Sequence, residues 1–180
     1  MLTAQPDSSR RSLPLPLVLP VILLLWITGC GYQPHGLGSL PAEIQRVHLA
    51  ALKNGTLRPG LQGIVGTAIL RRLQQDGRIR AAPQEAADAV LEGTISAYEN
   101  IPLAFEQGDI GRRFRVRLVL TMQLTGRNGE KVLLKEEVFG EAYYTAGTGV
   151  VATRAAEEEA SFRAAQDLAS RVVTRLLEGL

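Results

Sequence analysis

The strongest constraint on the fold is a regular alternation of side chains in the stretch RRFRVRLVLTMQL, which spans residues 112–124. Apolar side chains recur there at every second position, and arginines occupy the first positions between them. The two sets are Phe114, Val116, Leu118, Leu120 and Met122 on one face, and Arg113, Arg115 and Arg117 on the other. A period of two predicts a β-strand that buries one face, so other parts of the chain must cover that face.

Three further segments alternate in a similar way. The predicted strands are residues 43–52, 88–97, 112–124 and 132–144. The pair Asn128-Gly129 predicts a hairpin between the last two strands. We expect a loop over residues 100–111, and a β-bulge near Glu136 and Glu137, where the alternation slips.

Two amphipathic helices are predicted to cover the sheet. The first ends at Asp76-Gly77, because glycine readily adopts the left-handed conformation at a helix C-terminus, and the second runs from about residue 153 to the end. Their apolar stripes are Leu61, Ile64, Val65, Ala68, Ile69 and Leu73, and then Phe162, Ala165, Ala169, Val172 and Leu176. The order strand, helix, strand, strand, strand, helix predicts the α+β class. We expect a two-layer α/β sandwich, with a four-stranded mixed sheet covered by two helices.

The N-terminal part has the layout of a lipoprotein signal peptide. Arg10 and Arg11 precede residues 13–28, which are mostly apolar but too short and too rich in proline for a membrane span. The residues Ile27-Thr28-Gly29-Cys30 resemble a bacterial lipobox, in which the cysteine becomes the acylated first residue of the mature protein. We therefore expect residues 1–29 to be the signal peptide, residues 30–42 the acylated N-terminus and tether, and residues 43–180 the sandwich domain. The alternative is an incidental or buried Cys30 behind an ordinary signal peptide.

Composition argues against several classes of protein. Removal of residues 1–29 would leave 18 basic and 17 acidic side chains, a near-neutral balance unlike that of a nonspecific nucleic-acid-binding protein. Cys30 has no partner for an intramolecular disulfide, and one cysteine with His35 and His48 is too few ligands for a zinc site. We expect no cofactor, no metal and no catalytic site.

Segments along the mature chain together resemble the LptE family of lipopolysaccharide-assembly lipoproteins. They are CGYQPHG at residues 30–36, NGTLRPGLQ at residues 54–62, ADAVLEGTISAY at residues 87–98 and an alanine-rich closing helix. The resemblance implies a noncatalytic lipoprotein of the Gram-negative envelope, anchored to the periplasmic side of the outer membrane through palmitate and other acyl chains on Cys30. It also implies a partner, the outer-membrane β-barrel LptD, whose lumen the protein plugs and whose assembly it assists during lipopolysaccharide transport to the outer leaflet.

The resemblance further suggests roles for the arginines. It implies lipopolysaccharide contact by Arg154 and by Arg112 and Arg113, since guanidinium groups pair well with phosphates. A polar strand face also suits a polar barrel lumen, so Arg115 and Arg117 are candidates for lumen contacts. The alternative for the strand arginines is an ordinary face that is solvated or paired with carboxylates.

Other polar residues have simpler interpretations. We expect His35 and His48 to be hydrogen-bonded or exposed. Asp88 and Glu92 would lie about 13 Å apart on one strand, too far for paired acid–base catalysis. The glutamates at positions 157–159 suit the positive end of a helix dipole. Two other functions stay open: an adaptor of another envelope assembly or secretion system, and a lipid-anchored hydrolase, for which scattered Ser, His and Asp residues are the only indication.

Overall fold

The computed structural model describes residues 44–104, 113–127, 129 and 131–178. The chain divides into two units, residues 1–35 and 36–180, and all described residues belong to the second. Cys30, the expected signal peptide, the tether and Arg112 lie outside the described residues. None of the helices in the described part of the chain is long and apolar enough to cross a membrane.

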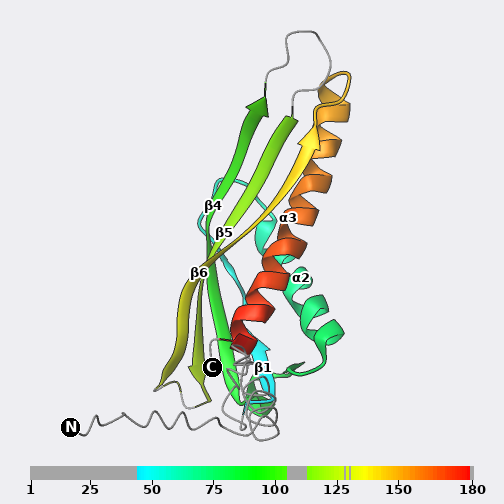
Figure 1. The fold of residues 1–180 in the computed structure, drawn as a ribbon. Helices are drawn as coiled ribbons and strands as arrows, with labels where there is room; N and C mark the ends of the chain where they lie inside the picture. The colour runs from blue at the N-terminus through cyan, green and yellow to red at the C-terminus, as the bar shows by residue number, and fades with distance from the viewer. Residues whose placement is uncertain (1–43, 105–112, 128, 130, 179–180) are drawn as a thin grey trace, which may run out of the picture. The chain divides into compact units, whose positions relative to one another are not determined.

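A mixed β-sheet forms one layer of the domain (Figure 1). Its strands are β1 (Arg46–Leu49), β2 (Lys53–Asn54), β3 (Arg80–Ala81), β4 (Ala89–Ala104), β5 (Arg113–Gly126) and β6 (Val132–Thr145). The order across the sheet is β3-β1-β4-β5-β6, and β2 pairs with β4 beyond the end of β1. β4, β5 and β6 are antiparallel neighbours, whereas β1 and β2 run parallel to β4. The four predicted strands are present, and two short strands add to them.

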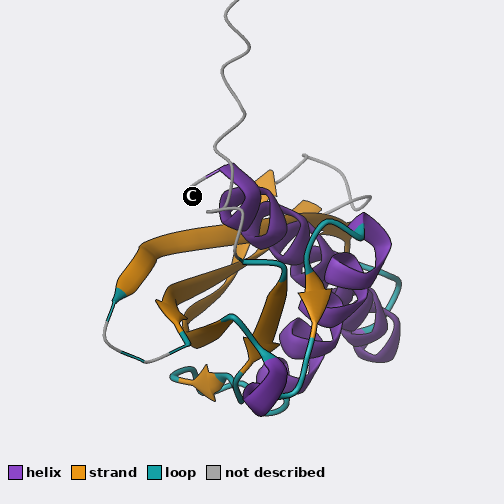
Figure 2. Cartoon of the chain, turned by 90° about the horizontal axis from the view of Figure 1, so that it is seen from below, coloured by secondary structure: helices purple, strands orange, loops and turns teal. Residues whose placement is uncertain are grey.

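Two helices, α2 (Leu61–Asp76) and α3 (Val150–Glu178), form the second layer, and a short 3-10 helix, η1 (Gln84–Ala86), precedes β4 (Figure 2). Both helices contribute to one hydrophobic core with the sheet, which confirms the predicted two-layer sandwich. The fully buried members include Leu61, Val65, Ile69 and Leu73 of α2, and Val116, Leu118 and Leu124 of β5. α2 ends as predicted, because Gly77 has a φ of 76° and its N–H donates to the Leu73 carbonyl at 3.1 Å.

Three predicted details of the strands and helices are wrong. Residues 100–104 belong to β4 rather than to a loop, because β4 stays paired with β5 as far as Ala104. The β5–β6 register is regular at Glu136 and Glu137, and it shifts instead next to Leu124, where β6 has Leu133 as an extra residue. α3 begins at Val150, earlier than predicted.

The buried face of α3 also differs from the prediction. Phe162 is 46% exposed, and the buried residues are Ala160, Ser161, Ala164, Ala165, Leu168, Ala169, Val172, Val173 and Leu176. Ser161 Oγ donates to the Glu157 carbonyl at 2.8 Å, so this buried hydroxyl is satisfied. The small side chains let α3 approach the sheet closely. A Cβ atom at Gly140 would lie 2.5 Å from the Leu168 Cβ and would also clash with the backbone of α3.

The two edges of the antiparallel part of the sheet have different neighbours. α3 bonds to the edge strand β6, where Asp167 Oδ2 accepts from the Glu141 N–H at 3.0 Å and Arg163 Nη2 donates to the Tyr143 carbonyl at 2.7 Å. On the opposite edge, β2 ends beside Ile95. The rest of β4 has no strand on that side within the residues that the structure describes.

Candidate functional site

A hollow of about 780 Å³ opens between the loop after β2, the middle of β4 and the first turns of α3. Its lining consists of residues 55–59, residues 96–98, Arg154 and Glu157. We call it the Arg154 hollow. It brings together three segments that are far apart in the sequence, and one of the predicted contact residues lies in it.

Asn54 holds the loop that forms one wall of the hollow. Its Oδ1 accepts from the Thr56 N–H at 3.0 Å and the Thr56 Oγ at 2.8 Å, and its Nδ2 donates to the Arg58 carbonyl at 2.8 Å. Asparagine commonly closes turns through such bonds to its own backbone neighbours. The Gly55 N–H donates to the Ile95 carbonyl at 2.9 Å, and a Cβ at Gly55 would lie 3.1 Å from that oxygen. The loop is therefore held closely against β4.

A polar network lines the inner part of the hollow. Arg58 Nη1 donates to Tyr98 Oη at 2.8 Å and pairs with Glu157 Oε1. Tyr98 Oη donates to Glu157 Oε1 at 2.7 Å and lies 3.3 Å from Ser161 Oγ. The Arg58 guanidinium also lies over the Tyr98 ring, 4.5 Å from its centroid. Three segments of the chain are thus joined through side chains.

Burial and hydrogen bonding determine the charges of this network. Partial burial raises the pKa of Tyr98 to about 12, and the nearby Glu157 carboxylate acts in the same direction. Burial opposes ionisation of Glu157 as well, but hydrogen bonds from Tyr98 and Arg58 outweigh it and hold the pKa of this carboxyl below its ordinary value. At neutral pH the network therefore contains a neutral phenol, and the positive charge of Arg58 is balanced by Glu157.

Arg154 supplies a positive charge at the hollow that no carboxylate of the described residues balances. Its side chain is exposed, and no carboxylate of the described residues lies within 4.0 Å of its guanidinium. Exposed apolar side chains lie on the same elements: Leu57 lines the same hollow, and Val150 and Val151 precede Arg154 by four and three positions, which places them on the same side of α3. A guanidinium without a carboxylate partner among the described residues, on a surface with exposed apolar side chains, suits a ligand that combines an anionic group with hydrocarbon.

The predicted strand arginines lie on the other face of the sheet. Arg113 is exposed and lies 5.4 Å from the Tyr143 ring centroid, and Arg117 lies 4.1 Å from the Phe139 ring centroid. The apolar side chains that alternate with these arginines, such as Val116 and Leu118, are buried against the helices. The arginines therefore point to the opposite face and cannot reach the Arg154 hollow through the sheet. The structure thus separates two residues, Arg113 and Arg154, that we predicted to share one ligand.

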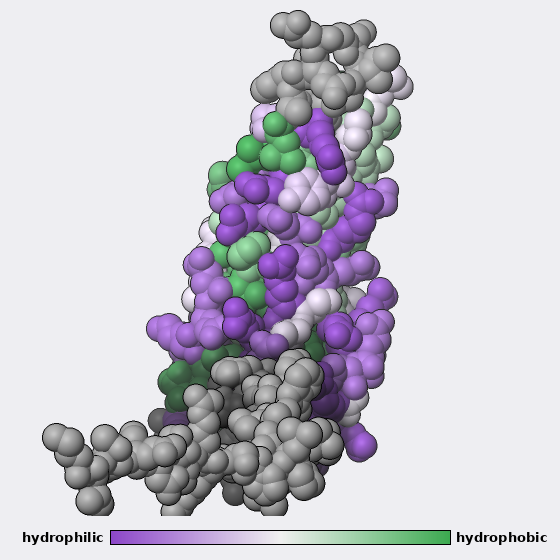
Figure 3. All heavy atoms as spheres, viewed as in Figure 1, coloured by the Kyte–Doolittle hydropathy of each residue, from purple (hydrophilic) through white to green (hydrophobic). Residues whose placement is uncertain are grey.

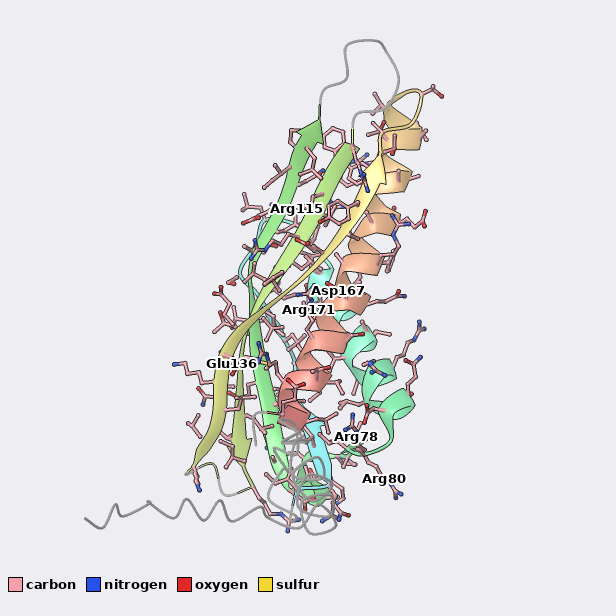
Figure 4. All side chains as sticks on the ribbon, viewed as in Figure 1. Arg78, Arg80, Arg115, Glu136, Asp167 and Arg171 are labelled. Atoms are coloured by element: carbon pink, nitrogen blue, oxygen red, sulfur yellow. The ribbon has the colours of Figure 1, made fainter. Side chains whose placement is uncertain are left out.

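Arg115 lies between Arg113 and Arg117 on β5, and Figure 4 labels it. Its Nη1 is 3.9 Å from Glu141 Oε2, which is a weak ion pair. The Nε atoms of Arg115 and Arg117 are buried and have no hydrogen-bond partner among the described residues. The face seen in Figure 3 is largely hydrophilic, with separate hydrophobic areas. The strand arginines therefore form a polar face that is only partly neutralised.

The structure also tests the simpler interpretations. His48 Nδ1 lies 3.1 Å from the Ala82 carbonyl, which confirms a hydrogen-bonded imidazole. Asp88 pairs with Arg46 at 2.7 Å. The dipole interpretation of Glu157 is wrong, because α3 begins at Val150 and this carboxylate bonds to Tyr98 and Arg58. Among the residues described, no cluster of three or more His, Cys, Asp and Glu side chains could hold a metal ion.

The polar network was not predicted from the sequence. Tyr98 lies 40 residues from Arg58 and 59 residues from Glu157, and none of the three has a distinctive local pattern. The NGTLRPG segment does contain Arg58, but as a turn and helix start rather than as a site. Only the tertiary structure places these residues together.

Comparisons with known proteins agree with this fold. The model of the LptE family, described as Lipopolysaccharide-assembly, matches residues 44–176, which is more than half of the chain. No curated protein matches the chain in sequence. The chain is similar in structure to a minor lipoprotein from Acinetobacter baumannii, with a TM-score of 0.50, 16% identity, and coverage of 74% of this chain and 92% of that chain. It is also similar to protein XCC0632 from Xanthomonas campestris, with a TM-score of 0.51, 14% identity, and coverage of 78% and 90% respectively.

Proposed function

The chain belongs to the LptE family of lipopolysaccharide-assembly proteins, and we propose that it is the lipoprotein subunit of a lipopolysaccharide translocon. In this role Cys30 carries the acyl chains that anchor the protein to the periplasmic side of the outer membrane. The domain occupies the lumen of an LptD-like β-barrel, assists the assembly of that barrel and aids lipopolysaccharide insertion into the outer leaflet. The role is one of binding, without catalysis.

The arrangement of side chains at the Arg154 hollow supports direct lipid contact. Lipopolysaccharide carries phosphate groups and acyl chains in one molecule. The hollow contains Leu57 and the Arg154 guanidinium, which no described carboxylate pairs with, and the exposed Val150 and Val151 lie one turn before Arg154 on α3. A guanidinium can donate two parallel hydrogen bonds to a phosphate. The apolar side chains would be removed from water by contact with hydrocarbon. Arg58 is less suited to this task, because Glu157 already balances its charge.

The strand arginines support the barrel partnership. A barrel lumen is polar, and Arg113, Arg115 and Arg117 present a polar face of β5 that described carboxylates neutralise only in part. The terminal guanidinium nitrogens of Arg115 and Arg117 could donate charge-assisted hydrogen bonds to lumen side chains. These contacts leave the Arg154 hollow, on the other side of the sheet, available to lipid.

The barrel partnership is tested by affinity purification from detergent-solubilised outer membranes. We expect recovery of a large β-barrel protein in stoichiometric amount, together with acyl groups on Cys30 by mass spectrometry. We also expect misassembled barrel and loss of surface lipopolysaccharide when the protein is depleted, and no turnover in esterase and glycosidase screens. Repeated recovery of the lipoprotein alone would contradict the proposal and would favour an adaptor of another envelope assembly.

Lipid contact is tested by the charge reversal Arg154→Glu. A hydrogen bond to a charged group contributes about 1.5–3 kcal/mol, so we expect lipopolysaccharide affinity to fall by about tenfold or more. Arg71→Glu is the matched control, because Arg71 is an exposed arginine of α2 that does not line the Arg154 hollow. Barrel assembly should be measured separately in both variants. Equal losses of lipid affinity in the two variants would contradict a specific role for Arg154.

A further inference from the structure

A row of charged side chains crosses one end of the sheet. Arg46 of β1 and Arg80 of β3 are direct partners in a parallel ladder. Asp88, the residue before β4, lies beside Arg46, and the N–H of Arg127, the residue after β5, donates to the Asp88 carbonyl at 2.9 Å. The order across the sheet is therefore Arg80, Arg46, Asp88, Arg127.

This row is on the face of the sheet opposite the helices. Val47, Ile79 and Ala89 are buried in the core with the helices. Successive residues of a strand point to opposite faces, so the neighbouring residues Arg46 and Arg80 point away from the core.

The carboxylate in the row is already neutralised by one arginine. Asp88 accepts hydrogen bonds from Arg46 Nη2 at 2.7 Å, from Arg46 Nε at 3.3 Å and from the N–H groups of Gln45 and Arg46. The Asp88 side chain is 17% exposed and that of Arg46 is 48% exposed. Solvent therefore meets the guanidinium rather than the carboxylate.

Two arginines of the row carry charge that no described carboxylate balances. Arg127 Nη2 donates to the carbonyl of Glu85 at 2.9 Å, which leaves its charge intact. Arg80 has no carboxylate of the described residues within 4.0 Å. Neighbouring strands are only about 4.8 Å apart, and like charges on facing positions destabilise a sheet. Sheet stability therefore does not explain Arg80 beside Arg46.

Arg78 adds a further exposed guanidinium at this end. Its partner Asp76 is 9% exposed, whereas the Arg78 side chain is 68% exposed. Figure 4 shows Arg78 and Arg80 pointing outward, at the end of the domain where β1 begins. The basic end of the domain is thus defined by Arg46, Arg78, Arg80 and Arg127. Asp88 and Asp76, the partners of Arg46 and Arg78, are much less exposed than the arginines they bind.

The position of the basic end relative to the chain indicates its ligand. The described chain begins at Ile44, directly before β1, so the segment that connects the domain to Cys30 joins it beside this row. We propose that the basic end binds the anionic phospholipid headgroups of the bilayer that holds the acyl chains. This inference rests on the proposed anchoring at Cys30. It assigns to the domain a membrane-facing surface, distinct from the Arg154 hollow and from the arginines of β5.

Energy transfer between the domain and the bilayer tests this inference on the lipidated protein. Gln84→Cys places a fluorescent label on η1, an exposed element next to the row, and vesicles carry an acceptor on a headgroup. We expect phosphatidylglycerol to raise the transfer efficiency relative to phosphatidylcholine alone, and we expect high salt to reverse the change. A basic residue near an anionic surface strengthens binding about fivefold, so Arg78→Glu with Arg80→Glu should weaken docking about 25-fold or more.

A matched control separates this effect from net charge. Lys53→Glu with Lys135→Glu makes the same change in charge at exposed residues in the middle of the sheet, and it should leave the transfer unchanged. Transfer that does not respond to phosphatidylglycerol in the unaltered domain would overturn the inference, and so would an equal loss in the control. The response to phosphatidylglycerol and salt needs no charge substitution, so misfolding of a variant cannot obscure it. Mass spectrometry of Cys30 on the same sample separates failure of docking from failure of the proposed anchoring.

Discussion

The two edges of the antiparallel β4-β5-β6 sheet are protected by different means. At the β6 edge, the backbone of the strand bonds to side chains of α3, through Asp167 to Glu141 and through Arg163 to Tyr143. Gly140 lets the helix backbone approach the strand closely. At Glu141 and Tyr143 this edge is therefore part of the packed structure, and it cannot accept another strand there without displacement of α3.

The distal part of the β4 edge lacks such cover within the described residues. Ile101 and Leu103 are exposed there, and Figure 3 shows hydrophobic surface next to hydrophilic surface at this end of the sheet. Tyr98 pairs with Leu118 of β5 on one side, and its side chain is bonded to Arg58 and Glu157. The comparison teaches that the β6 edge of the sheet contributes to stability, whereas the β4 edge borders the proposed lipid site.

The largest expected effect comes from Gly140→Ala. The new Cβ would meet the backbone of α3, so helix and strand must separate. We expect a loss of at least about 3 kcal/mol in the free energy of unfolding, at the upper end of overpacking effects. Gly126→Ala is the control, because the nearest atom to its Cβ would be 3.9 Å away, and we expect a loss below about 1 kcal/mol. Urea unfolding measures both, and similar losses would contradict the close approach at β6.

A smaller effect is expected from Asp167→Ala. The substitution removes the acceptor for the Glu141 N–H and the partner of Arg171, which should cost about 1–2 kcal/mol. Glu159→Ala removes an exposed ion pair with Arg163 on the same helix, and should cost less than about 0.5 kcal/mol. Urea unfolding measures both variants. Equal losses in the free energy of unfolding would show that the hydrogen bond between Asp167 and the β6 edge stabilises the domain no more than an exposed ion pair does.

Tyr98→Phe tests the side-chain network at the β4 edge. The folded pKa of Tyr98 is raised from 10.0 to about 12, so its contribution to stability is complete below pH 10 and is lost as the pH rises from 10 toward 12. We expect Tyr98→Phe to cost about 1 kcal/mol at neutral pH and to remove the part of the alkaline loss that this tyrosine causes. The free energy of unfolding, measured from about pH 8 to about pH 12, tests this expectation. Tyr143→Phe on β6 is the control, and this variant should keep the alkaline loss of stability. If the loss disappeared in Tyr143→Phe and remained in Tyr98→Phe, its assignment to Tyr98 would be contradicted.

The smallest change in stability is expected from Pro102→Thr. Proline within a sheet is confined to positions where its missing N–H faces away from a neighbouring strand, so Pro102 removes a donor from the open edge of β4. We expect less than about 1 kcal/mol of change in stability, but more self-association by sedimentation velocity. Pro83→Thr, in the loop before η1, should leave self-association unchanged. Equal behaviour of the two variants would mean that Pro102 does not limit pairing at this edge.

The parts of the fold that the sequence predicts are those with long local patterns. The alternation of β5 predicts its buried and exposed faces, and the stripe of α2 with Gly77 predicts that helix and its end. β2 and β3 have two residues each, too few for a period to be recognised. The stripe of α3 was misplaced at Phe162, because the helix packs through small residues such as Ala164 and Ser161 rather than through its largest apolar side chain.

The candidate site was predictable only where a family motif supplied a residue. Arg154 came from such a motif, and it does lie in the hollow. The network of Arg58, Tyr98 and Glu157 depends on segments brought together by the tertiary structure, and no spacing along the chain indicates it. The charged row at the basic end likewise depends on the register of β1 with β3 and β4.

The arrangement of β4, β5 and β6 also has a kinetic consequence. These strands follow one another in the chain and pair as sequential neighbours, whereas β1 reaches β4 only after the crossover through α2. Contacts between residues near in sequence form sooner than those that close long loops. We expect the three long strands to form a folding nucleus, and the parallel strands to dock afterwards. β1, the first strand of the domain, would then be among the last to become ordered.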